Sequence, residues 1–232
     1  MAPSSLAVRR IMLDTKRVIE DKDIAESGIF WVGDELDLTH GWAFVCGMDG
    51  TPYHGGIYCF EVKFPDNYPF EPPAFTYLTN DGRNRFNPNL YKNGKVCISL
   101  LNTWQGEQWS GVQSLGSILQ CIQTAVLIND PLRNEPAYSN VSLHVDIPVY
   151  NRIIFHANVE TAILSQLTDP PPYLVPVLAA ARAHALKCRD EVVKKLQEMI
   201  PEWNKKTEAI TFYSMTQKYQ FDVLLERLKA LV

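Results

Sequence analysis

The sequence has no long apolar run, either at its amino terminus or elsewhere, so we expect neither a secretory signal nor a membrane span. Its five cysteines are odd in number and lack the close pairing of a disulfide framework or a metal site. The formal net charge is −4, with an acidic middle between weakly basic ends, which argues against a nucleic-acid binder. Free thiols without a signal segment favour the cytosol or the nucleus.

What is present suits one sizeable domain with an appendage, because 232 residues with 46% hydrophobic content bury a substantial core. Aromatic and branched residues alternate between turn signals in four segments, which predict an antiparallel meander: 28–32, 42–48, 57–63 and 74–78. Helical spacing appears before and after the meander, over 3–22, 112–128 and 148–167. The expected fold class is therefore α+β.

The first expected helix begins after Ser4 or Ser5, either of which can cap it. Its predicted apolar face is formed by Val8, Ile11, Met12, Thr15 and Ile19. Its arginines project elsewhere, either as a plain solvated face or as a docking surface for an acidic protein partner.

A boundary follows the third helix, where Asp169 precedes three prolines that cannot continue a helix. We expect a core over residues 1–168 and a helical hairpin extension over 169–232. Pro201 should end the long first helix of the hairpin, and Ile210 and Phe221 belong to the apolar side of the second. Such a hairpin has to bury its apolar stripes, by packing on its own core, by pairing with another copy, or by forming a groove for a partner.

The chemistry concentrates between Tyr68 and Pro136. Asn93-Gly94 predicts a tight turn, and Cys97 follows it at the start of a short apolar run, where a substrate can reach a thiol. The amide of Asn89 is a candidate donor to the oxyanion formed when a thioester is attacked. Glu135, between two prolines, is a candidate for orienting or deprotonating an incoming amine.

Each of these three residues also has a simpler interpretation. A cysteine in an apolar run is most often a buried small hydrophobe. Asn89 follows a proline and suits an ordinary turn, and Glu135 suits a solvated loop. No histidine accompanies Cys97 nearby, so a protease-like ion pair is not indicated, whereas acyl exchange with an activated thioester needs less activation.

The combination resembles the core of the ubiquitin-conjugating enzyme family over roughly residues 3 to 165. Its Tyr-Pro-Phe-x-Pro-Pro segment is intact at Tyr68–Pro73, and the cysteine follows the asparagine by eight residues, as in Asn89 to Cys97. Trp109-Ser110 and the acidic Glu135 match later parts of the pattern.

Three departures from the common pattern stand out. Asn87 replaces the usual histidine, and an insertion reads Thr103-Trp104-Gln105-Gly106, which is similar to the large, atypical subgroup of the family. Gly111-Val112 replaces the family's Pro-Ala after Trp109-Ser110, which puts conventional ligase docking in question.

The resemblance implies a carrier that holds ubiquitin, or a ubiquitin-like modifier, as a thioester on Cys97 and transfers it to a substrate lysine. It implies an activating-enzyme contact through Arg9, Arg10 and Arg17 on the first helix. It also implies a ligase contact through Phe70 and Ser110. Neither a metal nor an organic cofactor is expected, because the activating enzyme performs the adenylation.

Two rival functions fit the same sequence. One is a non-catalytic modifier-binding or scaffold protein on the same fold, against which the joint presence of Cys97, Asn89 and Glu135 argues. The other is a cysteine hydrolase of the modifier, which requires a histidine within hydrogen-bond reach of Cys97.

Overall fold

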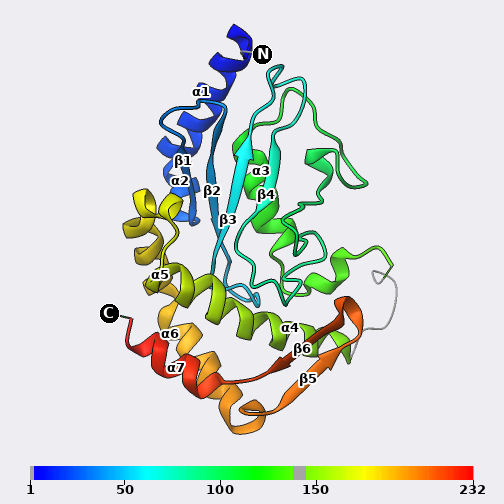
Figure 1. The fold of residues 1–232 in the computed structure, drawn as a ribbon, viewed down its shortest axis with the longest axis vertical. Helices are drawn as coiled ribbons and strands as arrows, with labels where there is room; N and C mark the ends of the chain where they lie inside the picture. The colour runs from blue at the N-terminus through cyan, green and yellow to red at the C-terminus, as the bar shows by residue number, and fades with distance from the viewer. Residues whose placement is uncertain (1–2, 138–144, 232) are drawn as a thin grey trace.

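The structure, a computed structural model, describes residues 3–137 and 145–231. A four-stranded antiparallel sheet lies at its centre, in the order β1-β2-β3-β4 (Figure 1), which confirms the predicted meander. Its strands are β1 (Ile29–Gly33), β2 (His40–Cys46), β3 (Ile57–Lys63) and β4 (Ala74–Tyr77). The helices of the core are α1 (Ser5–Glu20), α2 (Lys22–Glu26), α3 (Leu115–Cys121), α4 (Asp146–Ala157) and α5 (Gln166–Thr168). The α+β fold class is confirmed.

Helix α1 begins as predicted, with the Ser4 hydroxyl accepting a hydrogen bond from the Ala7 N–H at 3.1 Å. The predicted apolar face was wrong by about one position. The buried residues are Ala7, Ile11, Asp14 and Val18, whereas Met12 and Ile19 are exposed. Asp14 makes this face hard to recognise in the sequence, because a carboxylate is rarely buried in a fold unless it is paired.

The middle strands of the sheet are covered on both faces. Phe44 of β2 and Phe60 of β3 are fully buried, and both strands contain continuous runs of buried residues, as strands covered on both faces do. The π-helical segment η2 (Ile122–Val126), which continues α3, contacts β2, whereas η4 (Asn158–Ser165) contacts β3 and η5 (Pro172–Val177) contacts β1. Tyr173 of η5 stacks on Trp42, with 5.9 Å between ring centroids.

The segment after residue 169 differs from the expected helical hairpin. It contains α6 (Leu178–Trp203) and α7 (Phe221–Lys229), but a β-hairpin of β5 (Thr207–Ile210) and β6 (Met215–Lys218) separates them. Ile210 therefore lies in a strand, and α6 continues two residues beyond Pro201. Figure 1 shows β5 and β6 running alongside α4, beneath the ends of the central strands, and β5 contacts α4.

The extension buries its apolar residues against the rest of the chain. Leu196, Phe221 and Leu224 belong to the same buried cluster as the core, and the rings of Phe155 and Phe221 lie 6.3 Å apart. Burying one such side chain stabilises a fold by about 1.5–3 kcal/mol. Among the described residues, none of the helices combines the length and the apolar character needed to cross a membrane.

His156 joins α4 to the extension and is buried. Its Nε2 accepts a hydrogen bond from the Gln220 N–H at 3.2 Å, so the ring is neutral, and it packs edge-on against Phe221. Burial, followed by the nearby charge of Arg83, lowers its pKa from 6.5 to about 4.

We expect this histidine to make the fold acid-sensitive. Below pH 6.5 the unfolded chain protonates His156 while the folded chain does not until about pH 4. Its contribution is therefore complete above pH 6.5 and falls between 6.5 and 4, by at most about 1.4 kcal/mol per pH unit. Urea unfolding at pH 7 and pH 5 should show a smaller pH-dependent loss in His156→Gln than in the wild type. Equal losses in both proteins would contradict the assignment.

Candidate active site

Cys97 is fixed by its own backbone. The chain turns at Gly94, whose φ of +88° suits glycine, and returns towards Asn89. The Cys97 N–H donates to the Asn89 carbonyl at 2.9 Å, and the Asn89 amide Nδ2 donates to the Cys97 carbonyl at 2.6 Å. Cys97 itself is only 2% exposed. The predicted turn is present, but the thiol is enclosed, whereas the sequence predicted one that a substrate can reach.

The segment after Cys97 is held by the insertion that the sequence singled out. The Thr103 hydroxyl lies 3.0 Å from the Val96 carbonyl and accepts a hydrogen bond from the Ile98 N–H at 3.0 Å. Asn102 adopts a left-handed conformation, and its side chain accepts a hydrogen bond from the Trp109 N–H at 2.9 Å. The insertion therefore braces the backbone on the carboxyl side of Cys97.

Asn87, at the position of the usual histidine, is fully buried. Its Nδ2 lies 2.9 Å from the Tyr53 hydroxyl and 2.7 Å from the Val126 carbonyl, and its Oδ1 accepts a hydrogen bond from the Asn89 N–H. An amide is suited to this position, because it donates and accepts at once without carrying a charge. Asn87 thus anchors the Asn89 segment to η2.

Glu135 follows the short 3₁₀ turn η3 (Pro131–Asn134) and is half-buried. The turn is tied to η2 by the Asn134 amide, which donates to the Ala125 carbonyl at 3.1 Å. The Tyr213 hydroxyl donates to Oε2 of Glu135 at 3.3 Å. The acidic loop is therefore held from both sides.

One hollow of 190 Å³ brings the parts of the predicted site together. It is lined by Asn89, by Ile98 and Ser99 directly after Cys97, by Trp104 and Cys121, and by Asn134 directly before Glu135. The Asn89 Oδ1 is buried and, among the described residues, has no hydrogen-bond partner. A buried polar group without a partner costs about 1–3 kcal/mol.

The histidines of the described chain are engaged away from Cys97. His40 contacts Asp34 and Glu61, His54 contacts Glu191, and His156 accepts from Gln220. The ring of His184 lies beside Gly28. None of these four has a hydrogen bond to Cys97 within the described residues, so the hydrolase interpretation gains no support.

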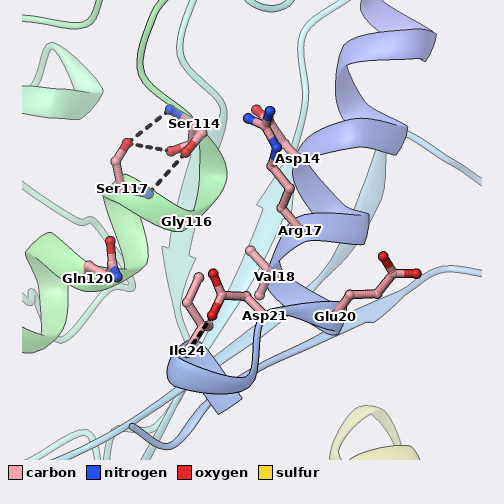
Figure 2. Close-up of a pocket in the computed structure, with 10 residues that line it drawn as sticks. All are labelled: Asp14, Arg17, Val18, Glu20, Asp21, Ile24, Ser114, Gly116, Ser117 and Gln120. Atoms are coloured by element: carbon pink, nitrogen blue, oxygen red, sulfur yellow. Dashed lines mark hydrogen bonds between the residues drawn. The ribbon is translucent and has the colours of Figure 1, made fainter. Parts of the chain in front are cut away.

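The three arginines predicted to contact the activating enzyme are not equivalent. Arg9 and Arg17 are exposed, and Arg17 lines a 490 Å³ hollow between α1, α2 and α3 (Figure 2). Arg10 instead holds the fold together. It pairs with Asp14 at 3.0 Å, and it donates to the carbonyls of Gly111, at 2.8 Å, and Gln113. Asp14 in turn accepts a hydrogen bond from the Tyr68 hydroxyl.

The residues predicted to contact a ligase lie on the surface. Phe70 is 72% exposed, and Ser110 is exposed as well. The loops that carry them are joined, because the Trp109 indole donates to the Pro69 carbonyl at 2.8 Å. Val112, in the altered part of the pattern, is 90% exposed and extends this apolar surface.

Sequence reasoning missed two residues of the site. Arg85 lies with its guanidinium carbon 3.4 Å from the ring centre of Tyr91, in the flap between Asn89 and Cys97. Tyr213 lies in the extension, which the family pattern does not cover. The only signal for it in the sequence was a pair of adjacent aromatic residues in the otherwise polar segment 211–214.

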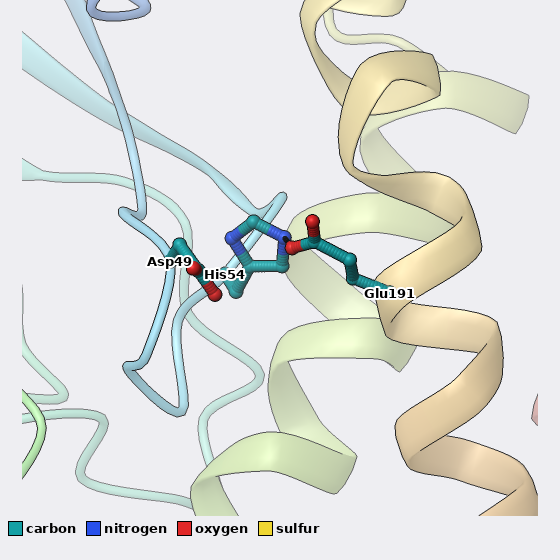
Figure 3. A group of neighbouring side chains, drawn as sticks. All are labelled: Asp49, His54 and Glu191. Atoms are coloured by element: carbon teal, nitrogen blue, oxygen red, sulfur yellow. Dashed lines mark ion pairs between the residues drawn. The ribbon is translucent and has the colours of Figure 1, made fainter.

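Three potential metal ligands meet elsewhere, between the β2–β3 loop and α6 (Figure 3). The Nε2 of His54 lies 2.9 Å from Oε2 of Glu191, and the candidate ligand atoms of these residues and Asp49 lie within 4.8 Å of one another. Both carboxylates are exposed, and the histidine–glutamate ion pair accounts for the arrangement. Sequence spacing could not reveal this group, because α6 lies far from the loop along the chain.

Comparison with known proteins supports the family that the motifs indicated. Residues 10–161 match the model of the family described as ubiquitin-conjugating enzyme. The chain belongs to the ubiquitin-conjugating enzyme family.

Several individual relatives are similar over most of the chain. Ubiquitin-conjugating enzyme E2 Z of Homo sapiens is 32% identical over 200 residues, which cover 82% of this chain and 56% of that protein. Its counterpart in Xenopus tropicalis is 37% identical over 165 residues, 71% of this chain and 51% of that protein. Probable ubiquitin-conjugating enzyme protein 17 of Caenorhabditis elegans is 37% identical over 184 residues, 76% and 25%. The chain spans at most about half the length of these relatives.

Within this ubiquitin-conjugating fold, we predict that Arg10 is structural. Arg10→Ala leaves the fully buried Asp14 carboxylate without its cation and should lower the free energy of unfolding by about 3 kcal/mol or more. Arg9→Ala, on the exposed side of α1, is the matched control and should change it by about 0.5 kcal/mol at most. Urea unfolding at pH 7 compares the two. Equal effects would show that Arg10 is not part of the buried network.

Proposed function

We propose that this chain carries ubiquitin, or a ubiquitin-like modifier, as a thioester on Cys97 and transfers it to a lysine amine. The proposal rests on one observation. Asn89, the residues directly after Cys97, and Asn134 directly before Glu135 line one hollow of a ubiquitin-conjugating fold; a buried hydrogen bond joins Asn89 to Cys97, and a second bond ties Asn134 to η2.

Charging is a thioester exchange. The Cys97 sulfur attacks the modifier's terminal carbonyl, a new C–S bond forms, and the C–S bond to the activating enzyme breaks as its thiolate leaves. The Cys97 proton passes to that thiolate or to water. Because Cys97 is only 2% exposed, this step requires a small movement of the loops around it.

Transfer is an aminolysis. The lysine nitrogen attacks the thioester carbonyl, an amide bond forms, and Cys97 leaves as a thiolate. Glu135 orients the amine and accepts its proton. Asn89 stabilises the oxyanion once its amide turns from the Cys97 carbonyl to the reacting oxygen, a rearrangement typical of sites that tighten only around substrate.

The partners follow from the same proposal. Arg9 and Arg17 remain exposed for an activating enzyme, whereas Arg10 contributes by fixing α1 to the loop of Gly111. Phe70 and Ser110, with Val112 beside them, offer an apolar surface for a ligase. Ubiquitin or a similar modifier and protein lysines complete the set. All five cysteines are free, as a reducing compartment such as the cytosol or nucleus requires.

A charging assay tests the carrier step. The protein is mixed with activating enzyme, ATP and ubiquitin, and adducts are compared with and without reducing agent; the assay is repeated with other modifiers and their activating enzymes. We expect a reducible adduct that disappears in Cys97→Ala. Charge reversal of Arg9 and Arg17 to Glu should slow charging.

Cys121→Ala is the matched control, because Cys121 lines the same hollow. Burial raises the pKa of its thiol, which disfavours the nucleophilic thiolate, so the adduct should persist in this variant. Loss of the adduct in Cys121→Ala alone would move the carrier to Cys121. No adduct with any modifier would favour the scaffold interpretation.

The transfer step is tested separately by discharge of the charged protein to free lysine. Glu135→Gln and Asn89→Ala should each slow discharge by about tenfold or more, because each removes a group that acts on the transition state. Glu35→Gln makes the same carboxylate-to-amide change at an exposed position in the turn after β1. It is the control and should discharge as the wild type does. Discharge of Glu135→Gln at the wild-type rate would remove Glu135 from the mechanism.

A further inference from the structure

The tip of the extension's β-hairpin lies beside the candidate site. Figure 1 shows the turn between β5 and β6 near one end of α4. Two consecutive non-glycine residues at this turn, Tyr213 and Ser214, have left-handed φ values of 61° and 49°. Such conformations are unfavourable for L-residues and cluster at functional sites, where the surrounding structure enforces them.

The hairpin that carries this turn is firmly attached to α4. Arg152 of α4 donates to both carboxylate oxygens of Glu208, at 2.7 and 2.6 Å, and the Tyr219 hydroxyl donates to the same carboxylate at 2.6 Å. Bidentate pairs of this kind fix orientation as well as distance. Met215, the first residue of β6, is buried. The position of the turn is therefore determined by the fold.

From this turn Tyr213 reaches the acidic loop. Its hydroxyl donates to Oε2 of Glu135 at 3.3 Å, and the edge of its ring meets Tyr150 of α4, with 6.3 Å between centroids. The two partners of the hydrogen bond are 78 residues apart along the chain. Glu135 is thus oriented by a side chain from outside the region that the family pattern covers.

Tyr213 also reaches the asparagine segment, through Arg85. The Arg85 guanidinium carbon lies 4.5 Å from the ring centre of Tyr213 and 3.4 Å from that of Tyr91. Its Nη2 donates to the Pro88 carbonyl at 2.6 Å, directly before Asn89. A cation between two aromatic faces with a backbone acceptor at its end is a rigid link, because each contact restricts the same planar group.

We propose that Tyr213 is a positioning residue for lysine aminolysis: its hydroxyl orients the Glu135 carboxylate, and its ring braces the Asn89 segment through Arg85. The helical and β-hairpin extension is then a working part of the acyl-transfer site. This inference rests on the proposed carrier function. It predicts an effect on transfer and none on charging, because Glu135 acts on the amine and not on the incoming thioester.

The test separates the two steps. Wild type, Tyr213→Phe and Tyr213→Leu are charged with ubiquitin, or with whichever modifier the wild type accepts, and then discharged to free lysine in a single turnover. Tyr213→Phe removes only the hydroxyl and should slow discharge by about two- to tenfold. Tyr213→Leu also removes the ring over Arg85 and should slow it further. Tyr173→Phe, whose ring stacks on Trp42, is the matched control and should discharge normally.

A double variant distinguishes positioning from general loosening of the fold. If the Tyr213 hydroxyl acts through Glu135, adding Tyr213→Phe to Glu135→Gln should slow discharge no further than Glu135→Gln alone. Independent, multiplying effects would overturn the proposal, as would normal discharge of Tyr213→Phe. Failure of the wild type to form any adduct would instead refute the carrier function, so the two failures are distinguishable. Thermal unfolding of each variant identifies any that fails to fold.

Discussion

The reciprocal pair of hydrogen bonds between Asn89 and Cys97 is the constraint on which the candidate site depends. The Cys97 N–H reaches the Asn89 carbonyl, and the Asn89 amide reaches the Cys97 carbonyl. Both bonds are buried, where low polarity strengthens them and makes their loss expensive. The flap between the two residues is thereby closed into a loop of fixed register. Asn87, just before this loop, donates a hydrogen bond to the Val126 carbonyl and so joins the loop to η2.

The same pair explains why the resting site is enclosed. The Asn89 Nδ2 donates to the Cys97 carbonyl, and the buried Asn89 Oδ1 has no hydrogen-bond partner among the described residues. An interior optimised for stability alone would satisfy that oxygen. In the proposed mechanism the Asn89 amide moves by a side-chain rotation, and stabilising the oxyanion then needs no large rearrangement of the backbone.

The sequence predicted what depends on local pattern. Alternation predicted the meander, and Asn93-Gly94 predicted the turn that precedes Cys97; the roles of Asn89 and Glu135 stay predictions. It did not predict features that depend on distant partners. Asp14 misled the assignment of the buried face of α1, because its burial is explained only by Arg10 and by Tyr68, 54 residues away. Ile210 was assigned to a helix, because a single apolar residue cannot distinguish the helical from the strand periodicity. Its strand partner Met215 lies on the other side of a turn, so the pairing was not visible in the local sequence.

The placement of the extension shows why such distant contacts matter for function. Helix α4 supports the β-hairpin through Arg152, and it also supports the backbone of Arg85, whose carbonyl accepts a hydrogen bond from Tyr150 at 2.6 Å. One rigid helix therefore carries both routes by which Tyr213 reaches the site, and rigid elements hold reacting groups more accurately than loops do. Asn89 and Glu135 lie on loops that are separate in sequence. Their common attachment to α4, through Arg85 and Tyr213, holds their relative positions.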